Sequence, residues 1–267
     1  MPPMTRFDTI SCLTDLGRAD EHVGLVHSIL RELSPGSLAI DVCHDIEPGD
    51  TRAAALMLAR SVPYLAPGVV LVSVGAELER PAIAVEVGDG QAALVGPDNG
   101  VLGAAVAVVG GADRAVQLTN EDLHFASPGV TFPARDVIAP AVGHLAAGAP
   151  LDSLGTPVDP AMLLPSLVPV PRIEDDGSLA AEVLTIDRLG GAQLNVDRDA
   201  LEGMGDVLVL EFGEEKRVVK LAAEGVRSAG GPALVDDIHG LLAVSSPEGA
   251  RQMGLSVGAE VVIREAR

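Results

Sequence analysis

The sequence predicts a two-domain protein, with an N-terminal α/β domain built on a central, mostly parallel sheet and a smaller C-terminal β-barrel. Three observations lead to this prediction. Strand-like and helix-like segments alternate in the first half, the stretch 156–178 carries five prolines and several acids, and only short strand-like segments follow it. Proline restricts the backbone and removes an N–H donor, so this stretch suits neither a regular helix nor a central strand. We place the α/β domain at residues 1–160, a proline-rich linker at 161–178 and the β-barrel at 179–267.

The N-terminal segments follow a βαβαβ order. Apolar runs predict strands at 7–14, 37–43 and 69–74, and helical periodicity predicts helices at 19–33 and 50–62. In the first helix the apolar residues recur at every third or fourth position, so one face is expected to pack on the sheet.

Further segments complete this domain. Asp50 is a suitable N-cap for the second helix. The segment 82–96 reads as a hairpin around a Gly-Asp-Gly turn at 88–90, and Ala-rich segments predict helices at 100–111 and 135–148.

The C-terminal third contains short apolar runs separated by Gly-rich and acidic turns, a pattern typical of a small barrel or sandwich. Strands are expected at 179–189, 206–212, 217–223, 232–237, 241–246 and 259–265.

Composition and charge exclude several classes of partner. The chain has 267 residues, 48% of them hydrophobic and 2% aromatic, which suits one large or two modest cores of Ala, Val and Leu. Its 38 acidic residues against 18 basic ones give a formal net charge of −20. Such a field repels phosphate backbones and anionic lipid headgroups, so we expect neither nucleic acid nor a membrane as a partner.

The same composition bears on location. The N-terminal residues lack the basic start and apolar core of a signal peptide, and no apolar run is long enough to span a bilayer. We therefore expect a soluble, cytoplasmic protein. Cys12 and Cys43 fall in strand-like segments without metal-ligand spacing, which favours buried, reduced thiols.

One loop interrupts an otherwise regular pattern. The strand-like run that begins at Val69 gives way between Ser73 and Arg80 to small and acidic residues, and a second strand-like run follows. A strand that ends in a Gly-containing loop is a common place for a ligand site in an α/β protein, because the backbone can approach the ligand there. The loop from Ser73 to Arg80 is therefore our first candidate for an active site.

Five stretches together resemble a known family. They are "LTDLG" at 13–17, "DVCHDIEPGD" at 41–50, "VGPDNGVLG" at 95–103, "FPARDVIAPAVGHLAAG" at 132–148 and "LTIDRLGGAQLNV" at 184–196. In this order they resemble the S-adenosyl-L-methionine (SAM) hydroxide adenosyltransferases, relatives of the fluorinating and chlorinating enzymes that attack SAM at ribose C5′. The resemblance implies an α/β domain followed by a β-barrel, a homotrimer with sites between neighbouring subunits, and SAM as the substrate, with no cofactor and no metal.

The resemblance also implies roles for three polar residues. Asp15 is expected to hold the ribose diol, since a carboxylate can accept from two adjacent hydroxyls. Asn99 is expected near the nucleoside, and Asn195 at the methionine end of SAM. Each position has an alternative reading: Asp15 as a helix N-cap, Asn99 as part of an Asn-Gly turn, and Asn195 as an ordinary strand-edge residue.

The catalytic positions depart from the family pattern. Hydrolytic members carry an Asp, an Arg and a His that are proposed to position and activate water. A gapless alignment places Ser73 at the Asp, Arg80 at the Arg and Pro133 at the His. Only the Arg is retained, because Ser73 is a poor base and Pro133 has no polar side chain. Arg80 and Ser73 are thus the candidate catalytic residues.

Several residues are candidates to replace the missing groups. The loop itself contains Glu77 and Glu79, and elsewhere the chain offers His124, His144 and His239. Nothing in the sequence brings one of these histidines to the candidate loop.

Three functions follow from this comparison. The first is hydrolysis of SAM to adenosine and L-methionine by water or hydroxide, slowed by the two changed positions. The alternatives are a non-hydrolytic SAM or adenosine binding protein, favoured by the loss of the Asp and the His, and an enzyme that acts on a different nucleoside. A halide-using enzyme is disfavoured, because the halogenating relatives carry Tyr-Pro where this chain has Ser73 and Val74.

Overall fold

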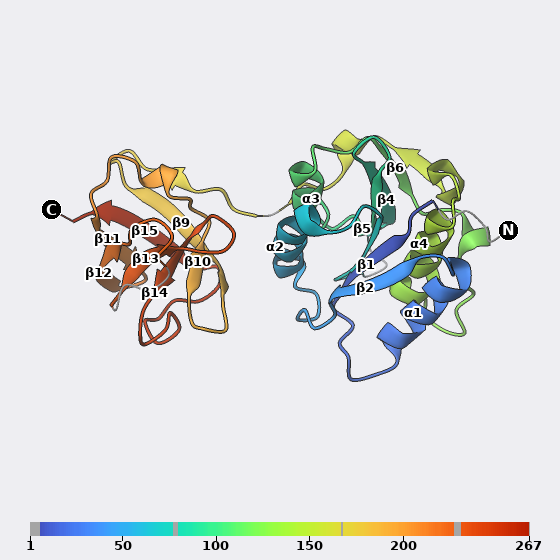
Figure 1. The fold of residues 1–267 in the computed structure, drawn as a ribbon, viewed down its shortest axis with the longest axis horizontal. Helices are drawn as coiled ribbons and strands as arrows, with labels where there is room; N and C mark the ends of the chain where they lie inside the picture. The colour runs from blue at the N-terminus through green and yellow to red at the C-terminus, as the bar shows by residue number, and fades with distance from the viewer. Residues whose placement is uncertain (1–5, 77–79, 167, 227–230, 267) are drawn as a thin grey trace. The chain divides into compact units, whose positions relative to one another are not determined.

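The computed structural model describes residues 6–76, 80–166, 168–226 and 231–266. The chain divides into two compact units, Met1–Val168 and Pro169–Arg267. The first is a mixed α/β unit and the second a β-barrel, as Figure 1 shows, so the predicted fold class is confirmed.

The N-terminal unit is built on a seven-stranded sheet in the order β2-β1-β3-β5-β4-β6-β7. Strands β2, β1, β3 and β5 run parallel to one another, whereas β4 pairs antiparallel with β5, and β6 and β7 follow in further antiparallel pairings. The strands are β1 (Thr9–Thr14), β2 (Leu38–Cys43), β3 (Val69–Ser73), β4 (Ala82–Val87), β5 (Ala92–Pro97), β6 (Arg114–Gln117) and β7 (Thr156–Val158).

In the described part of this unit, four α-helices cover the sheet: α1 (His22–Leu33), α2 (Thr51–Ser61), α3 (Gly103–Val108) and α4 (Ala139–Ala146). The central strands are apolar on both faces, as expected for parallel strands between helices. One core contains Leu71 of β3 and the inward residues of α1 and α4, and the other contains Val72 of β3 and those of α2 and α3. Figure 1 shows the two helix pairs on opposite faces.

Several local predictions are confirmed, and others need correction. Asp50 caps α2, its carboxylate accepting from the Ala53 amide, and β4 and β5 form the expected hairpin. The expected helix 100–111 is shorter, and 135–148 opens with a π-helical turn (Ala134–Ile138) before α4. Shorter 3₁₀ turns, which the apolar pattern did not indicate, lie at Val62–Tyr64, Glu121–Leu123, Leu151–Leu154, Pro160–Met162 and Asp199–Leu201.

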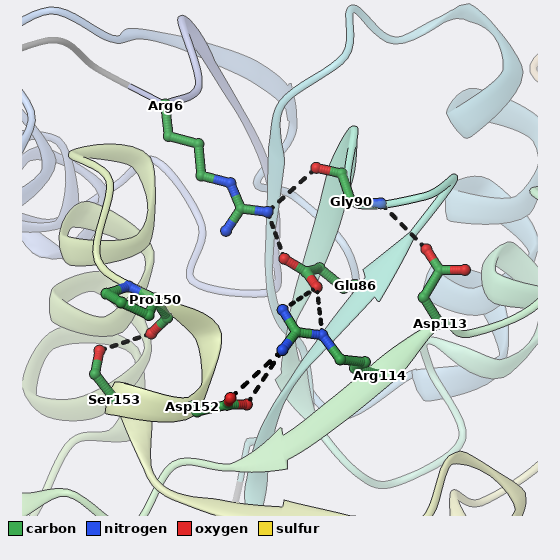
Figure 2. A network of polar contacts seen from close by, with 8 residues as sticks. All are labelled: Arg6, Glu86, Gly90, Asp113, Arg114, Pro150, Asp152 and Ser153. Carbon is green, nitrogen blue, oxygen red and sulfur yellow. Dashed lines mark hydrogen bonds and ion pairs between the residues drawn. The ribbon is translucent and has the colours of Figure 1, made fainter.

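A buried ion cluster secures the sheet at the end of β4. Glu86 is 3% exposed, and its carboxylate is bound by Arg6 and by Arg114, whose Nη2 and Nε lie 2.6 and 2.9 Å from Oε2. Arg114 also reaches Asp152 at 3.4 Å (Figure 2). Burial raises the pKa of Glu86, but the hydrogen bonds from the two guanidinium groups outweigh it and hold that pKa below its ordinary value of 4.5. The cluster ties the N-terminal segment to β4 and β6.

The C-terminal unit is a closed barrel. Its strands are β8 (Arg172–Ile173), β9 (Leu179–Ile186), β10 (Ala192–Leu194), β11 (Val207–Phe212), β12 (Glu215–Leu221), β13 (Ala233–Asp236), β14 (Leu242–Ser245) and β15 (Glu260–Glu265). Strands β9 to β15 form the ring, which closes through the pairing of β10 with β9, and β8 adds to β9. Buried residues alternate along β11, where Leu208, Leu210 and Phe212 point into the core while Val207 stays exposed.

The proline-containing stretch is more ordered than its composition indicated. Residues 156–158 form β7, the edge strand of the sheet. No further described strand pairs with β7, so the missing N–H of Pro157 is tolerated there. Among the described residues there is no helix with the length and apolar character that crossing a membrane requires. Cys12 is buried and Cys43 half-buried, and both are free thiols.

Candidate active site

Three adjacent parallel strands end at the same edge of the sheet, β1 at Thr14, β3 at Ser73 and β5 at Pro97. The backbone N–H of Asp15 donates to the Ser73 carbonyl at 3.1 Å, which holds the first two ends together. Asn99 follows two residues after β5. The fold therefore brings three of the predicted site residues, Asp15, Ser73 and Asn99, to one edge, where α/β proteins commonly bind ligands.

Asp15 joins three loops. Its Oδ2 accepts from the backbone N–H of Gly49 and from that of Gly75, each at 2.9 Å. Helix α1 begins at His22 with Glu21 before it, so Asp15 is not its N-cap. The second carboxylate oxygen of Asp15 makes no hydrogen bond within the described residues, which leaves that oxygen available to a ligand hydroxyl.

Asn99 is used fully within the site loops. Its Nδ2 donates to the carbonyls of Val74 and Gly75 at 3.0 and 3.2 Å, and its Oδ1 accepts from the N–H of Val101 at 3.2 Å. Gly75 has a positive φ of 55°, and a Cβ there would lie 3.3 Å from the Asn99 amide and 3.2 Å from Thr51. Asn99 thus shapes the loop that follows β3.

Arg80 and Pro133 line one cavity of about 170 Å³. Ala76 also lines this cavity. It directly follows Gly75, whose N–H binds Asp15, so the cavity begins one residue from that hydrogen bond. The alignment placed Arg80 and Pro133 at interacting family positions, and the structure does bring them together. Ser73 is buried at the end of β3 and is not among the described residues that line this cavity.

His124 lies in the wall of the same cavity. It follows the short turn Glu121–Leu123 and is partly buried. Burial lowers its pKa below the ordinary value of 6.5, against the opposing effect of Glu121, so the imidazole is neutral at pH 7. No sequence signal placed it there, because it belongs to an irregular segment far from Arg80 in the chain. Glu77 and Glu79 lie outside the described residues.

The turn that carries Pro133 is held by a buried carboxylate. Asp136 accepts from the Phe132 N–H at 2.8 Å and from Arg135 Nε at 2.5 Å. Burial raises the pKa of Asp136, and these bonds outweigh it and lower the pKa below its ordinary value of 3.8. The Phe125 N–H donates to the Asp136 carbonyl at 2.9 Å. This bond fixes the segment next to His124 against the turn that contains Pro133.

Asn195 lies in the barrel unit, where it is 9% exposed. Its Oδ1 accepts from the Glu182 N–H at 2.7 Å, and its Nδ2 donates to the Pro169 carbonyl at 3.0 Å. The nearby Asp187 accepts from the N–H groups of Leu189 and Gly191, so it caps the turn between β9 and β10. Asn195 therefore has a clear structural use within its own unit.

Comparisons with known proteins agree with this architecture. Residues 10–155 match the family model described as the SAM hydroxide adenosyltransferase N-terminal domain. A protein of Salinispora tropica named (R)-S-adenosyl-L-methionine hydrolase is 45% identical over 204 residues, covering 76% of this chain and 77% of its own. A protein of Thermus thermophilus with the same name is 33% identical over 93% of this chain and 96% of its own. The crystal structure of an uncharacterized conserved protein from Thermotoga maritima superposes with a TM-score of 0.81 at 26% identity, covering 95% of this chain and 99% of the other.

Proposed function

The chain belongs to the SAM hydroxide adenosyltransferase family, and we propose that it hydrolyses S-adenosyl-L-methionine to adenosine and L-methionine. The hydrolases of Salinispora tropica and Thermus thermophilus support this reaction by their similarity over most of the chain. The observation that carries the proposal is the cavity that Arg80 and His124 share, one residue beyond the loop bound by Asp15.

The reaction requires that the protein position the attacking water and supply a group to accept its proton. It depends less on a strongly electrophilic group of the protein. Water attacks ribose C5′, the new C–O bond forms as the C–S bond breaks, and its electron pair leaves with sulfur as neutral methionine. Because a sulfonium charge is lost on the way, a site with little water favours the step. The attacking water must lie in line with the C–S bond and lose a proton to a nearby base.

The described residues can be assigned to these tasks. The second oxygen of Asp15 binds the ribose diol, while Asn99 holds the loop that faces the nucleoside. Arg80 orients the attacking water, and the neutral imidazole of His124 accepts its proton, in place of the family histidine that Pro133 replaces. Ser73, buried at the end of β3 and outside the wall of this cavity, stands at the position of the family Asp and is the second candidate catalytic residue. Asn195, in the barrel unit, is the residue that the family resemblance assigns to the methionine end of SAM.

Product analysis tests the reaction itself. The purified protein is incubated with SAM, and adenosine, methionine and other nucleosides are separated by chromatography. Formation of adenosine and methionine in equal amounts is the expected result. Saturable SAM or adenosine binding without any adenosine release would instead identify a binding protein and overturn the hydrolase proposal.

His124→Gln tests the proposed proton acceptor. Loss of a general base typically costs about 10²–10⁴-fold in rate, so adenosine formation should fall by that range while KM changes little. His144→Gln is the matched control, since His144 is also a partly buried imidazole of the same unit but lies on α4 and is not among the residues that line the cavity. Equal rates for the wild type and His124→Gln would remove His124 from the mechanism.

We further propose a homotrimer with sites between neighbouring subunits, and a cytoplasmic location. The family resemblance supports the first, and the free thiols of Cys12 and Cys43 are typical of a reducing compartment, which supports the second. Light scattering at micromolar concentration tests the assembly. A monomer that hydrolyses SAM at the full rate would contradict shared sites.

A further inference from the structure

A second polar cluster lies on the edge strand of the α/β unit, outside the cavity described above. His27 comes from α1, Asp41 from β2 and His44 from the residue that follows β2. Asp41 Oδ1 lies 2.8 Å from His27 Nε2 and 3.0 Å from His44 Nε2. One ligand atom from each of the three residues falls within 4.8 Å of the others, a spacing that one metal ion can bridge.

The hydrogen bonds of the two imidazoles are incomplete. The Nε2 atoms of His27 and His44 are buried, yet among the described residues neither has a hydrogen bond of acceptable alignment, although both lie close to the same carboxylate oxygen. Buried polar atoms nearly always have a partner, so this arrangement calls for an explanation. A cation placed between the three atoms would satisfy both nitrogens and the oxygen together.

We propose that His27, Asp41 and His44 bind one divalent transition-metal ion such as Zn²⁺, which two imidazoles and a carboxylate commonly bind in proteins. The side chains of His27 and Asp41 are about one-third exposed, so water can complete the coordination shell. The sequence indicated no metal, because the three ligands have no short, regular spacing and come together only when α1 packs against β2.

The surroundings of the cluster fit this role. His44 is fully buried, and its Nδ1 lies 2.8 Å from Thr14 Oγ1, a contact that orients the ring as outer-shell partners of metal ligands do. Arg18 approaches the other oxygen of Asp41, Oδ2, at 3.7 Å, and also faces Asp45 at 3.8 Å. The guanidinium therefore partly balances the carboxylate charge but leaves Oδ1 directed at the imidazoles.

The position of the cluster suggests a structural effect. The His44 carbonyl accepts from the Gly17 N–H at 2.7 Å, in the loop that carries Asp15. An ion held by these residues would link α1, the end of β2 and that loop, and would bind the folded state alone. It would raise stability without taking part in the attack on SAM, so the inference does not depend on the proposed function.

Zinc titration of the chelator-treated, dialysed full-length protein tests the site. We expect one Zn²⁺ per chain by calorimetry, and a rise in Tm of about 5–10 °C at a free Zn²⁺ concentration of about 100 times Kd. His27→Gln and Asp41→Asn should each weaken Zn²⁺ binding at least tenfold and remove most of the Tm rise. Both changed side chains are partly exposed, so the variants are expected to fold.

His22→Gln is the matched control, because His22 lies on the same helix, with its Nε2 3.7 Å from a carboxylate of Asp20. It should bind Zn²⁺ as the wild type does. Absence of saturable binding by the wild type would overturn the proposal. So would binding that His27→Gln and Asp41→Asn leave unchanged, since the ion would then be held elsewhere on the acidic surface.

Discussion

Asp15→Ala should weaken nucleoside binding and loosen the site loops at once, and the structure allows the two effects to be separated. One carboxylate oxygen accepts from two backbone N–H groups, those of Gly49 and Gly75, at 2.9 Å. The other is the one that we assign to the ribose diol. Asp15→Asn keeps an oxygen for the loops but removes the charge, so it perturbs the loops less than Asp15→Ala.

The size of each effect follows from these contacts. A hydrogen bond to a charged group contributes about 1.5–3 kcal/mol, so loss of the diol contact should raise the Kd for adenosine about 10- to 150-fold. The stability loss for Asp15→Ala should be about 1.5–3 kcal/mol. Most of it comes from the half-buried Gly75 N–H, because water can replace Asp15 at the exposed Gly49 N–H.

Calorimetry with adenosine and 2′,3′-dideoxyadenosine, on the wild type and Asp15→Ala, forms a thermodynamic cycle. If Asp15 binds the diol, removal of the hydroxyls should cost the wild type more than the variant, with a coupling of about 1 kcal/mol or more. Glu32→Ala, which removes an acid from the exposed surface of α1, controls for the change in net charge.

The opposite outcome would leave Asp15 with a structural role alone. Thermal unfolding could show that Asp15→Ala is less stable, while calorimetry shows that removal of the two hydroxyls costs the same binding free energy in the variant as in the wild type. Asp15 would then only hold the loops together. The ribose would then have to be bound by another residue, and the assignment of Asp15 would be wrong.

The remaining predictions concern the changed catalytic positions and the buried ion cluster. Ser73→Asp combined with Pro133→His should raise adenosine formation more than either change alone, because the two groups act as a unit. Adding Arg80→Ala to the double variant should cancel this gain. Equal rates for the single and double variants would count against the alignment. Pro133 has helical φ and ψ of −56° and −38°, which His adopts without strain, so the backbone should tolerate the change. Glu86→Gln should lower stability at pH 7 by about 1–3 kcal/mol, since the hydrogen bonds that the partly exposed Arg6 and Arg114 donate to it would lose their charged acceptor. Because the pKa of Glu86 is lowered on folding, its contribution to stability is complete above pH 4.5 and disappears as the pH falls through the folded-state pKa. The thermal unfolding curves of the wild type and Glu86→Gln should therefore converge in acid. A difference in Tm that persists at low pH would contradict this account.

Local patterns and the family resemblance were sufficient for much of this molecule. The period of apolar residues predicts α1, the capping position of Asp50 predicts the start of α2, and the Gly-Asp-Gly turn predicts the hairpin of β4 and β5. These features depend on residues that are neighbours in the chain, so the sequence records them directly. The order of the motifs likewise placed Asp15 and Asn99 after strands, as the structure confirms.

Which distant residues meet depends on how the helices and strands pack in three dimensions. His124 reaches the Arg80 cavity because a backbone bond from Phe125 to Asp136 holds its segment against the Pro133 turn. His27 and Asp41 come together because α1 packs over the edge of the sheet. In both cases the contact depends on long-range packing, whose energy is spread over many apolar residues and has no local signature in the chain. The sequence therefore determined the elements and the family, whereas the partners of its catalytic and metal-binding candidates were set by how those elements pack.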